Sequence, residues 1–152
     1  MFWPPDSPWA PWWRTDKETA LAICGLAKIT SSDVIYDLGC GEAELLITAA
    51  KEYGAKGVGV EIDAIRIVTA KLRVFKNRVN NLIQIKSGNF FKQDLSKATV
   101  INLYLVPKTL EKLKPKFLKE LSPGTRIVSY RYEMSLLKVK EDKKRKLFLY
   151  KI

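Results

Sequence analysis

The chain of 152 residues contains no histidine and only two cysteines, Cys24 and Cys40. Without an imidazole there is no histidine-based triad or general base, and with so few thiols a zinc site is nearly excluded, so we predict no metal site. The two cysteines form no C-x-x-C pair, and Cys40 is expected to be a small turn residue rather than a nucleophile. The sequence also lacks a run of about 18 apolar residues and a signal peptide, which predicts a soluble, cytoplasmic protein without membrane contact.

The composition is that of a globular domain, with 47% hydrophobic and 28% charged residues. The length suits one domain. The formal charge of +11 is large for this length. Such a charge indicates an anionic partner such as nucleic acid, or the lysine-rich surface that is typical of thermophile proteins. The dense basic run 143–146 is expected to be a solvated hairpin turn.

A glycine turn follows the first apolar run. Residues 34–38 read as a strand, and this strand contains Asp37. Two glycines, Gly39 and Gly41, then flank a single residue, and a helical pattern begins at Ala43. Glycines let the backbone approach a ligand closely, and the helix start offers free N–H groups, so we predict a nucleotide-binding turn. The dinucleotide fingerprint requires a small residue where this chain has Glu44, which disfavours NAD. A Walker A loop is absent from the sequence.

A second acid supports a nucleotide site. Residues 57–61 read as another strand, with Glu61 at its C-terminal tip. A carboxylate in this position can accept both hydroxyls of a ribose, which is common to NAD and S-adenosylmethionine sites. The alternative is a solvated strand end.

The remaining pattern alternates strands and helices. Thr15 and Glu18 match a capping box for a helix that runs to about Ala27. Helices are also predicted over 43–53 and 63–78, the latter with Ile65, Val68, Leu72 and Phe75 on one face and Arg66, Lys71 and Lys76 on the other. Further strands are predicted over 82–86, 99–104 and 126–130, and a helix over 108–121 that Pro115 bends or breaks.

Two β-like runs, 136–140 and 146–152, end the chain and predict an antiparallel hairpin at a sheet edge. The fold class is therefore α/β, with a Rossmann-like, doubly wound sheet of seven strands. Residues 1–15 hold all four tryptophans and four prolines. They predict an extended arm that either packs for stability or closes over the site, ahead of a single domain over 16–152.

The run 37–43 resembles motif I of the seven-strand methyltransferases that use S-adenosyl-L-methionine, matched at Asp37, Gly39 and Gly41. Ala43 replaces the third glycine. It keeps the site small but lacks the glycine's freedom of positive φ, so the exit of the turn is expected to differ slightly.

Over about residues 12–132 the chain is similar to the small archaeal protein-lysine methyltransferases, which are related to the non-SET histone-lysine methyltransferase and to mitochondrial lysine methyltransferases. The narrower pieces of this resemblance are the runs 87–91, 101–105 and 123–129. It implies that Asp37, Gly39 and Gly41 hold the methionine end, Glu61 the ribose, and Asn89 with Phe90 the adenine. The full cofactor set it implies is Thr15, Asp37, Leu38, Gly39, Cys40, Gly41, Glu61, Ile62, Asn89 and Phe90.

The resemblance implies methyl transfer to lysine side chains of proteins. Asn102 and Tyr104 follow the fourth strand, where a doubly wound sheet opens its crevice, and are the predicted catalytic residues. The predicted substrate wall is Trp12, Trp13, Leu105 and Pro107. Expected substrates are proteins with exposed lysines, including basic DNA-binding chromatin proteins, with broad specificity and a monomeric enzyme. The alternative is a nucleic-acid methyltransferase, or a nucleic-acid-associated protein whose basic surface dominates its function, with weak nucleic-acid binding.

Overall fold

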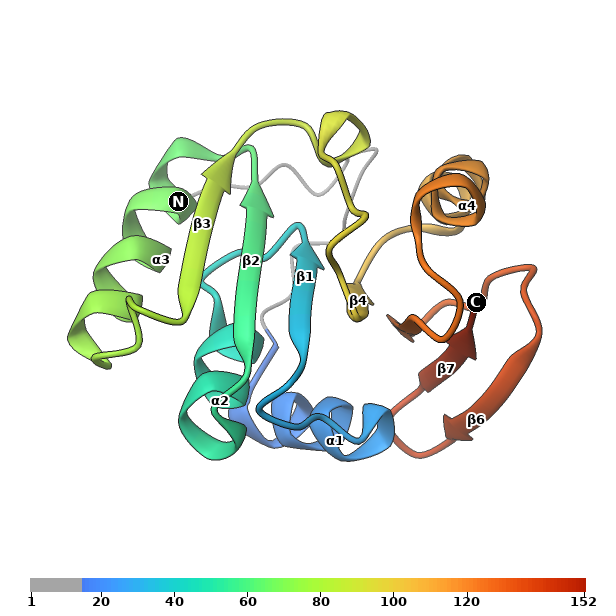
Figure 1. Cartoon of the computed structure of the whole chain (residues 1–152), viewed down its shortest axis with the longest axis horizontal. Coiled ribbons are helices and arrows are strands. Elements are labelled where there is room, and N and C mark those ends of the chain that lie inside the picture. The colour runs from blue at the N-terminus through green and yellow to red at the C-terminus, as the bar shows by residue number, and fades with distance from the viewer. Residues whose placement is uncertain (1–14) are drawn as a thin grey trace.

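The computed structural model describes residues 15–152. Figure 1 shows a twisted sheet with helices on both sides. The strands are β1 (Val34–Leu38), β2 (Lys56–Glu61), β3 (Ile83–Ser87), β4 (Val100–Leu103), β5 (Arg126–Tyr130), β6 (Lys138–Asp142) and β7 (Leu147–Lys151). The helices are α1 (Lys17–Ala27), α2 (Glu44–Tyr53), α3 (Ala64–Lys76) and α4 (Pro107–Glu120), with a short 3-10 helix η1 (Phe90–Lys92).

The seven strands lie in the order β3-β2-β1-β4-β5-β7-β6. The first five are parallel, and β7 pairs antiparallel with both β5 and β6. This arrangement confirms the predicted doubly wound sheet with a C-terminal antiparallel hairpin. The chain reverses its winding beside β1 and β4, so the carboxyl ends of these two strands border the crevice where such folds bind ligands.

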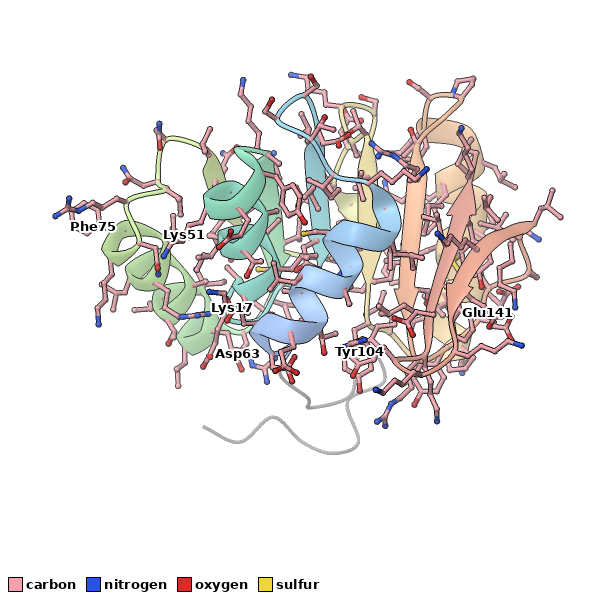
Figure 2. The ribbon with its side chains drawn as sticks, turned by 90° about the horizontal axis from the view of Figure 1, so that it is seen from below. Lys17, Lys51, Asp63, Phe75, Tyr104 and Glu141 are labelled. Carbon is pink, nitrogen blue, oxygen red and sulfur yellow. The ribbon has the colours of Figure 1, made fainter. Side chains whose placement is uncertain are left out.

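Two hydrophobic clusters cover the two faces of the sheet. One contains the buried residues of α1, α2 and α3, and the other those of η1 and α4. Figure 2 shows α1, α2 and α3 over the near face, with α4 behind the sheet. The central strands β1 and β4 are buried on both sides, which explains their nearly continuous apolar sequence.

The start of α1 differs from the predicted capping box. The N-cap is Asp16 rather than Thr15, and its carboxylate accepts a hydrogen bond from the Thr19 backbone N–H at 2.7 Å. Glu18 then lies at the second helical position, where it cannot complete a capping box. Asp16 is the stronger cap here because its negative charge also meets the positive end of the helix dipole.

The apolar face predicted for α3 is not the face that packs on the sheet. Its core-facing side chains are Ile67, Ala70 and Val74, which are buried. The four apolar residues predicted to share one face are exposed: Ile65, Val68, Leu72 and Phe75. The helix therefore has a second apolar face that points away from the sheet.

Pro115 does not break α4, which runs continuously from Pro107 to Glu120. Proline leaves the carbonyl of residue 111 without its helical partner. Pro115 is exposed, so water can bond that carbonyl, while Leu113 and Phe117 on the opposite side are fully buried. The packing of Leu113 before the proline and of Phe117 after it holds the helix together. The hairpin also begins later than predicted, at Lys138.

Candidate active site

Three of the predicted site residues, Asp37, Glu61 and Asn102, lie toward the carboxyl ends of neighbouring parallel strands. Asp37 of β1 pairs in register with Asn102 of β4 on one side and with Gly59 of β2 on the other. Glu61 ends β2 two residues beyond Gly59. Parallel strands deliver their carboxyl ends to one edge, so the sheet alone gathers these acids and the amide.

The glycine turn is held against β2. The backbone N–H groups of Gly39 and Cys40 both donate to the carbonyl of Val60, at 2.8 and 3.1 Å. Gly39 and Gly41 have positive φ angles of 77° and 55°. Ala43 has φ 65°, so the turn leaves through the left-handed conformation of a glycine, contrary to the expectation of a different exit. For a residue with a Cβ this conformation costs about 1–2 kcal/mol.

Gly59 is a site residue that sequence reasoning missed. A Cβ atom there would lie 2.7 Å from the Cys40 sulfur and 3.0 Å from a methyl group of Leu46. Only a glycine lets the turn and α2 sit this close to β2. A glycine inside an apolar strand signals such a close backbone approach, and this signal was present in the sequence.

Glu61 organises the turn through its carboxylate. One carboxylate oxygen accepts the Gly41 N–H at 2.8 Å, and the other accepts the N–H groups of Ile62 and Asp63 at 2.9 and 3.1 Å. The side chain is only 3% exposed. A carboxylate has about four acceptor positions, and these backbone N–H groups use three of them. The predicted ribose contact of Glu61 stays a prediction, and Ile62 beside it is exposed.

Asp37 and Asn102 form a buried polar pair. The Asn102 Nδ2 donates to the Asp37 carboxylate at 3.0 Å. Burial raises the pKa of Asp37 to about 7, which the hydrogen bond from Asn102 opposes and the nearby charge of Glu61 reinforces. The Asn102 side-chain oxygen is buried and has no hydrogen-bond donor among the described residues. A buried acid beside an amide oxygen that lacks a donor is a place where a ligand can supply a donor or a cation.

The aromatic side of the site follows β4. Tyr104 packs against Tyr130 of β5, with ring centroids 4.5 Å apart. Burial raises the pKa of Tyr104 to about 12, so it stays a neutral phenol. Leu105 is fully buried and lies beside the glycine turn, because a Cβ atom added at Gly39 would be 3.9 Å from its methyl group. Pro107 is exposed at the first position of α4. Their predicted substrate contacts stay predictions.

The loop after β3 lies beside the end of β2, because the Gly88 N–H donates to the Glu61 carbonyl at 3.0 Å. Asn89 uses its side-chain oxygen to accept the Phe91 N–H at 2.9 Å. Phe90 is buried at 8% exposure, with its ring 5.1 Å from that of Phe91. The predicted adenine contacts of Asn89 and Phe90 are not tested by this geometry.

Two other predictions concern the chain ahead of α1 and the cysteines. Thr15 is half-buried, while Trp12 and Trp13 lie outside the described residues.

Cys40 is buried, and this burial together with the charges of Asp37 and Glu61 raises the pKa of its thiol. A thiol with a raised pKa is a poor nucleophile, in line with a small turn residue. Over residues 15–152 no cluster of metal-ligating side chains is found.

The residues fit S-adenosylmethionine. Its methionine end carries an ammonium group, which the buried Asp37 carboxylate can meet. Its ribose can meet Glu61, and the glycine turn leaves room for close approach because Gly39 and Gly41 have no side chain. A seven-stranded sheet in this order, with this turn and these acids, defines a Rossmann-like methyltransferase that uses S-adenosylmethionine.

Comparison with known proteins identifies the family. The model of the ANTKMT methyltransferase domain matches residues 37–141, and the chain belongs to this family. A protein-lysine N-methyltransferase of Saccharolobus islandicus is 43% identical over 128 residues, which cover 84% of this chain and 80% of that protein. A lysine N-methyltransferase of Xenopus laevis, named for a component of ATP synthase, is 24% identical over 99 residues, covering 65% of this chain and 43% of that protein.

One solved structure is similar over nearly the whole chain. It is an RNA methyltransferase from Salinibacter ruber in complex with S-adenosyl-L-homocysteine, with a TM-score of 0.86 and 34% identity, covering 92% of this chain and 94% of that one. No helix over residues 15–152 is long and apolar enough to cross a membrane.

Proposed function

We propose that the protein transfers methyl groups from S-adenosylmethionine to lysine side chains of proteins in the cytoplasm. The observation that carries this proposal is the orphaned oxygen of Asn102, buried beside the tyrosine pair at the end of β4. A neutral lysine amine offers the N–H donor that this oxygen lacks. The name of the Saccharolobus islandicus relative, a protein-lysine N-methyltransferase, supports the same substrate class.

A lysine must lose its proton before it can accept a methyl group. The amine has a pKa near 10.4, so holding it neutral near pH 7 costs about 4–5 kcal/mol in water. An apolar wall at Tyr104 lowers this cost because it disfavours the charged form. The oxygen of Asn102 then accepts an N–H of the neutral amine and orients its lone pair.

Bound S-adenosylmethionine supplies an activated methyl group on a sulfonium, so the chain needs no general base in contact with the amine. Its own residues bind, orient and exclude water. Asp37 and the glycine turn hold the methionine end, Glu61 the ribose, and Asn89 with Phe90 the adenine. We also propose that residues 1–15 close over the cofactor, with Trp12 or Trp13 at the lysine channel and Thr15 near the methionine end.

The proposed substrates are proteins with exposed lysines, including basic DNA-binding proteins, with broad specificity. The charge of +11 repels a free cationic substrate. Repulsion between exposed charges is screened beyond about 8 Å at physiological salt, and a substrate already bound to DNA presents a net negative surface. Presentation on DNA therefore reconciles the charge of the enzyme with basic substrates.

A partition experiment tests the substrate class. The protein is incubated with methyl-labelled S-adenosylmethionine and an equal mixture of a basic chromatin protein and RNA, and the two are then separated by nuclease and protease digestion. We expect label in the protein fraction, in methylated lysine. Label in the RNA fraction alone would overturn the proposal.

A nucleic-acid methyltransferase is the second candidate function. It is favoured by the Salinibacter ruber structure, which is named an RNA methyltransferase, and by the net charge. Affinity for RNA and duplex DNA measured against salt concentration separates the two candidates. Binding through phosphates weakens steeply as salt rises, so a flat response removes nucleic acid as a partner.

A further inference from the structure

The exposed face of α3 is a regular apolar stripe. Its four side chains are Ile65, Val68, Leu72 and Phe75, with exposures of 59, 57, 65 and 72%. We call these four residues the α3 seam. The opposite face of the helix already packs on the sheet, so the fold does not need the seam. Large contiguous apolar patches on a soluble protein mark sites of interaction.

The spacing of the seam is that of a coiled coil. Its residues follow one another at steps of three, four and three, the a and d positions of two consecutive heptads. They span about 15 Å along the helix at 1.5 Å per residue. A strict a/d stripe fits one partner helix, because its knobs fill the holes of a single facing helix. Elsewhere an exposed Leu118 on α4 has no such neighbours on its helix.

Charges beside the seam oppose pairing with a second copy. Lys71 and Lys76 occupy the flanking g and e positions, and α3 contains no acidic residue. In a parallel pair of α3 helices, Lys71 would face Lys76 of the other copy, and in an antiparallel pair each lysine would face its own counterpart. Like charges at these positions oppose pairing, whereas acids at the facing positions favour it.

One cation of α3 is committed to the glycine turn rather than to the seam. Arg73 donates to the Glu42 carbonyl at 2.6 Å and pairs with Glu44 at 3.5 Å. Arg73 therefore faces α2 and the turn. The seam itself starts beside the site, because Ile65 lies four residues after Glu61. Figure 2 shows Asp63 at the same edge as Tyr104, and Phe75 at the far outer side of α3.

We propose that the α3 seam docks an amphipathic helix of a second protein, with apolar residues at a and d and acidic residues at e and g. This surface is independent of the methyl acceptor. A partner docked there lies next to the crevice without covering it, since the seam runs outward from the edge that carries Asp63 and Tyr104.

Two designed helical peptides test the proposal, both with leucine at a and d. One carries glutamate at e and g, and the other carries lysine. Binding of each fluorescent peptide is measured by anisotropy against the full chain. We expect the acidic peptide to bind at least about tenfold more tightly than the basic one, the equivalent of roughly 1.4 kcal/mol.

Variants of the chain make the test specific. Leu72→Gln with Phe75→Gln should remove binding, because both side chains are exposed anchors and glutamine keeps the helix. Lys71→Glu with Lys76→Glu should reverse the preference toward the basic peptide. Leu118→Gln on α4 is the matched control and should change nothing. Unchanged circular dichroism and cofactor affinity show that each variant is folded.

Several results would overturn the proposal. Equal affinity for both peptides, or a charge preference that Lys71→Glu with Lys76→Glu does not reverse, removes the charge argument. A further outcome is that the chain binds phosphatidylglycerol vesicles while neither peptide binds. If Leu72→Gln with Phe75→Gln abolishes that vesicle binding, the seam is assigned to a lipid surface. If the chain self-associates in sedimentation and the same double substitution abolishes this, the seam is assigned to a second copy of the chain.

Discussion

Asp37→Asn should abolish a pH dependence of stability that the buried acid imposes on the free protein. The carboxyl group is 6% exposed, and burial raises its pKa to about 7 from 3.8. The folded state therefore holds the proton more tightly than the unfolded chain. The stability from this proton is fully present below pH 4 and is lost as the pH rises through 7.

The size of the effect follows from the pKa. A difference of about three pH units, at 1.36 kcal/mol per unit, predicts a loss of about 4 kcal/mol between pH 4 and pH 7. Asparagine resembles the protonated acid and still accepts the hydrogen bond from Asn102. The variant should thus match the native protein at low pH and exceed its free energy of unfolding by about 4 kcal/mol at pH 8.

Urea unfolding of both proteins between pH 5 and pH 8, without cofactor, measures this difference. The chain has no histidine, so few other groups titrate in this range. The same substitution should weaken binding of S-adenosylmethionine, because it removes the charge that meets the ammonium group. Parallel stability curves for the two proteins across this range would refute the assignment of a buried, raised-pKa acid.

Three further substitutions probe other parts of the site. Ala43→Gly should raise the free energy of unfolding in urea by about 1 kcal/mol, since it relieves the positive φ angle, and no gain would contradict that strain. Glu61→Gln should weaken cofactor binding more than about tenfold in calorimetric titration, because one amide oxygen cannot serve the turn and the ribose; unchanged affinity would contradict the ribose contact. Arg126→Ala removes the ion pair of the buried Asp33 at the opposite sheet edge, where Asp33 keeps its hydrogen bonds from Thr30 and Thr99. It should cost about 3 kcal/mol of stability and leave cofactor affinity unchanged; a loss of affinity would show that the two edges are coupled.

Much of the fold could be predicted because its signals are local. The apolar runs of β1 and β4 are nearly continuous, and the capping glycine Gly54 ends α2. The exposed face of α3 could not be predicted, since helical periodicity shows that apolar residues share a face but not which partner that face meets. The buried face of α3 carries Ile67, Ala70 and Val74, whereas four further apolar residues lie on the exposed face.

The site shows the same division. Asp37, Gly39, Gly41 and Glu61 follow from motif spacing, because the strand and turn pattern fixes their places. Contacts between distant residues do not follow from motif spacing. Examples are the hydrogen bond from Asn102 to Asp37 and the three backbone hydrogen bonds that Glu61 accepts. Such contacts depend on the register of neighbouring strands, which one sequence does not encode locally.

The most direct test of lysine methylation at this site is intact-mass analysis of one lysine peptide. The peptide is incubated with S-adenosylmethionine and the native protein, Asn102→Ala or Arg126→Ala, and the product is fragmented to locate the methyl group. We predict methyl transfer to the lysine ε-nitrogen by the native protein and by Arg126→Ala, and a kcat reduced about 100-fold or more in Asn102→Ala. No methyl group on lysine with the native protein, or a full kcat in Asn102→Ala, would contradict the account.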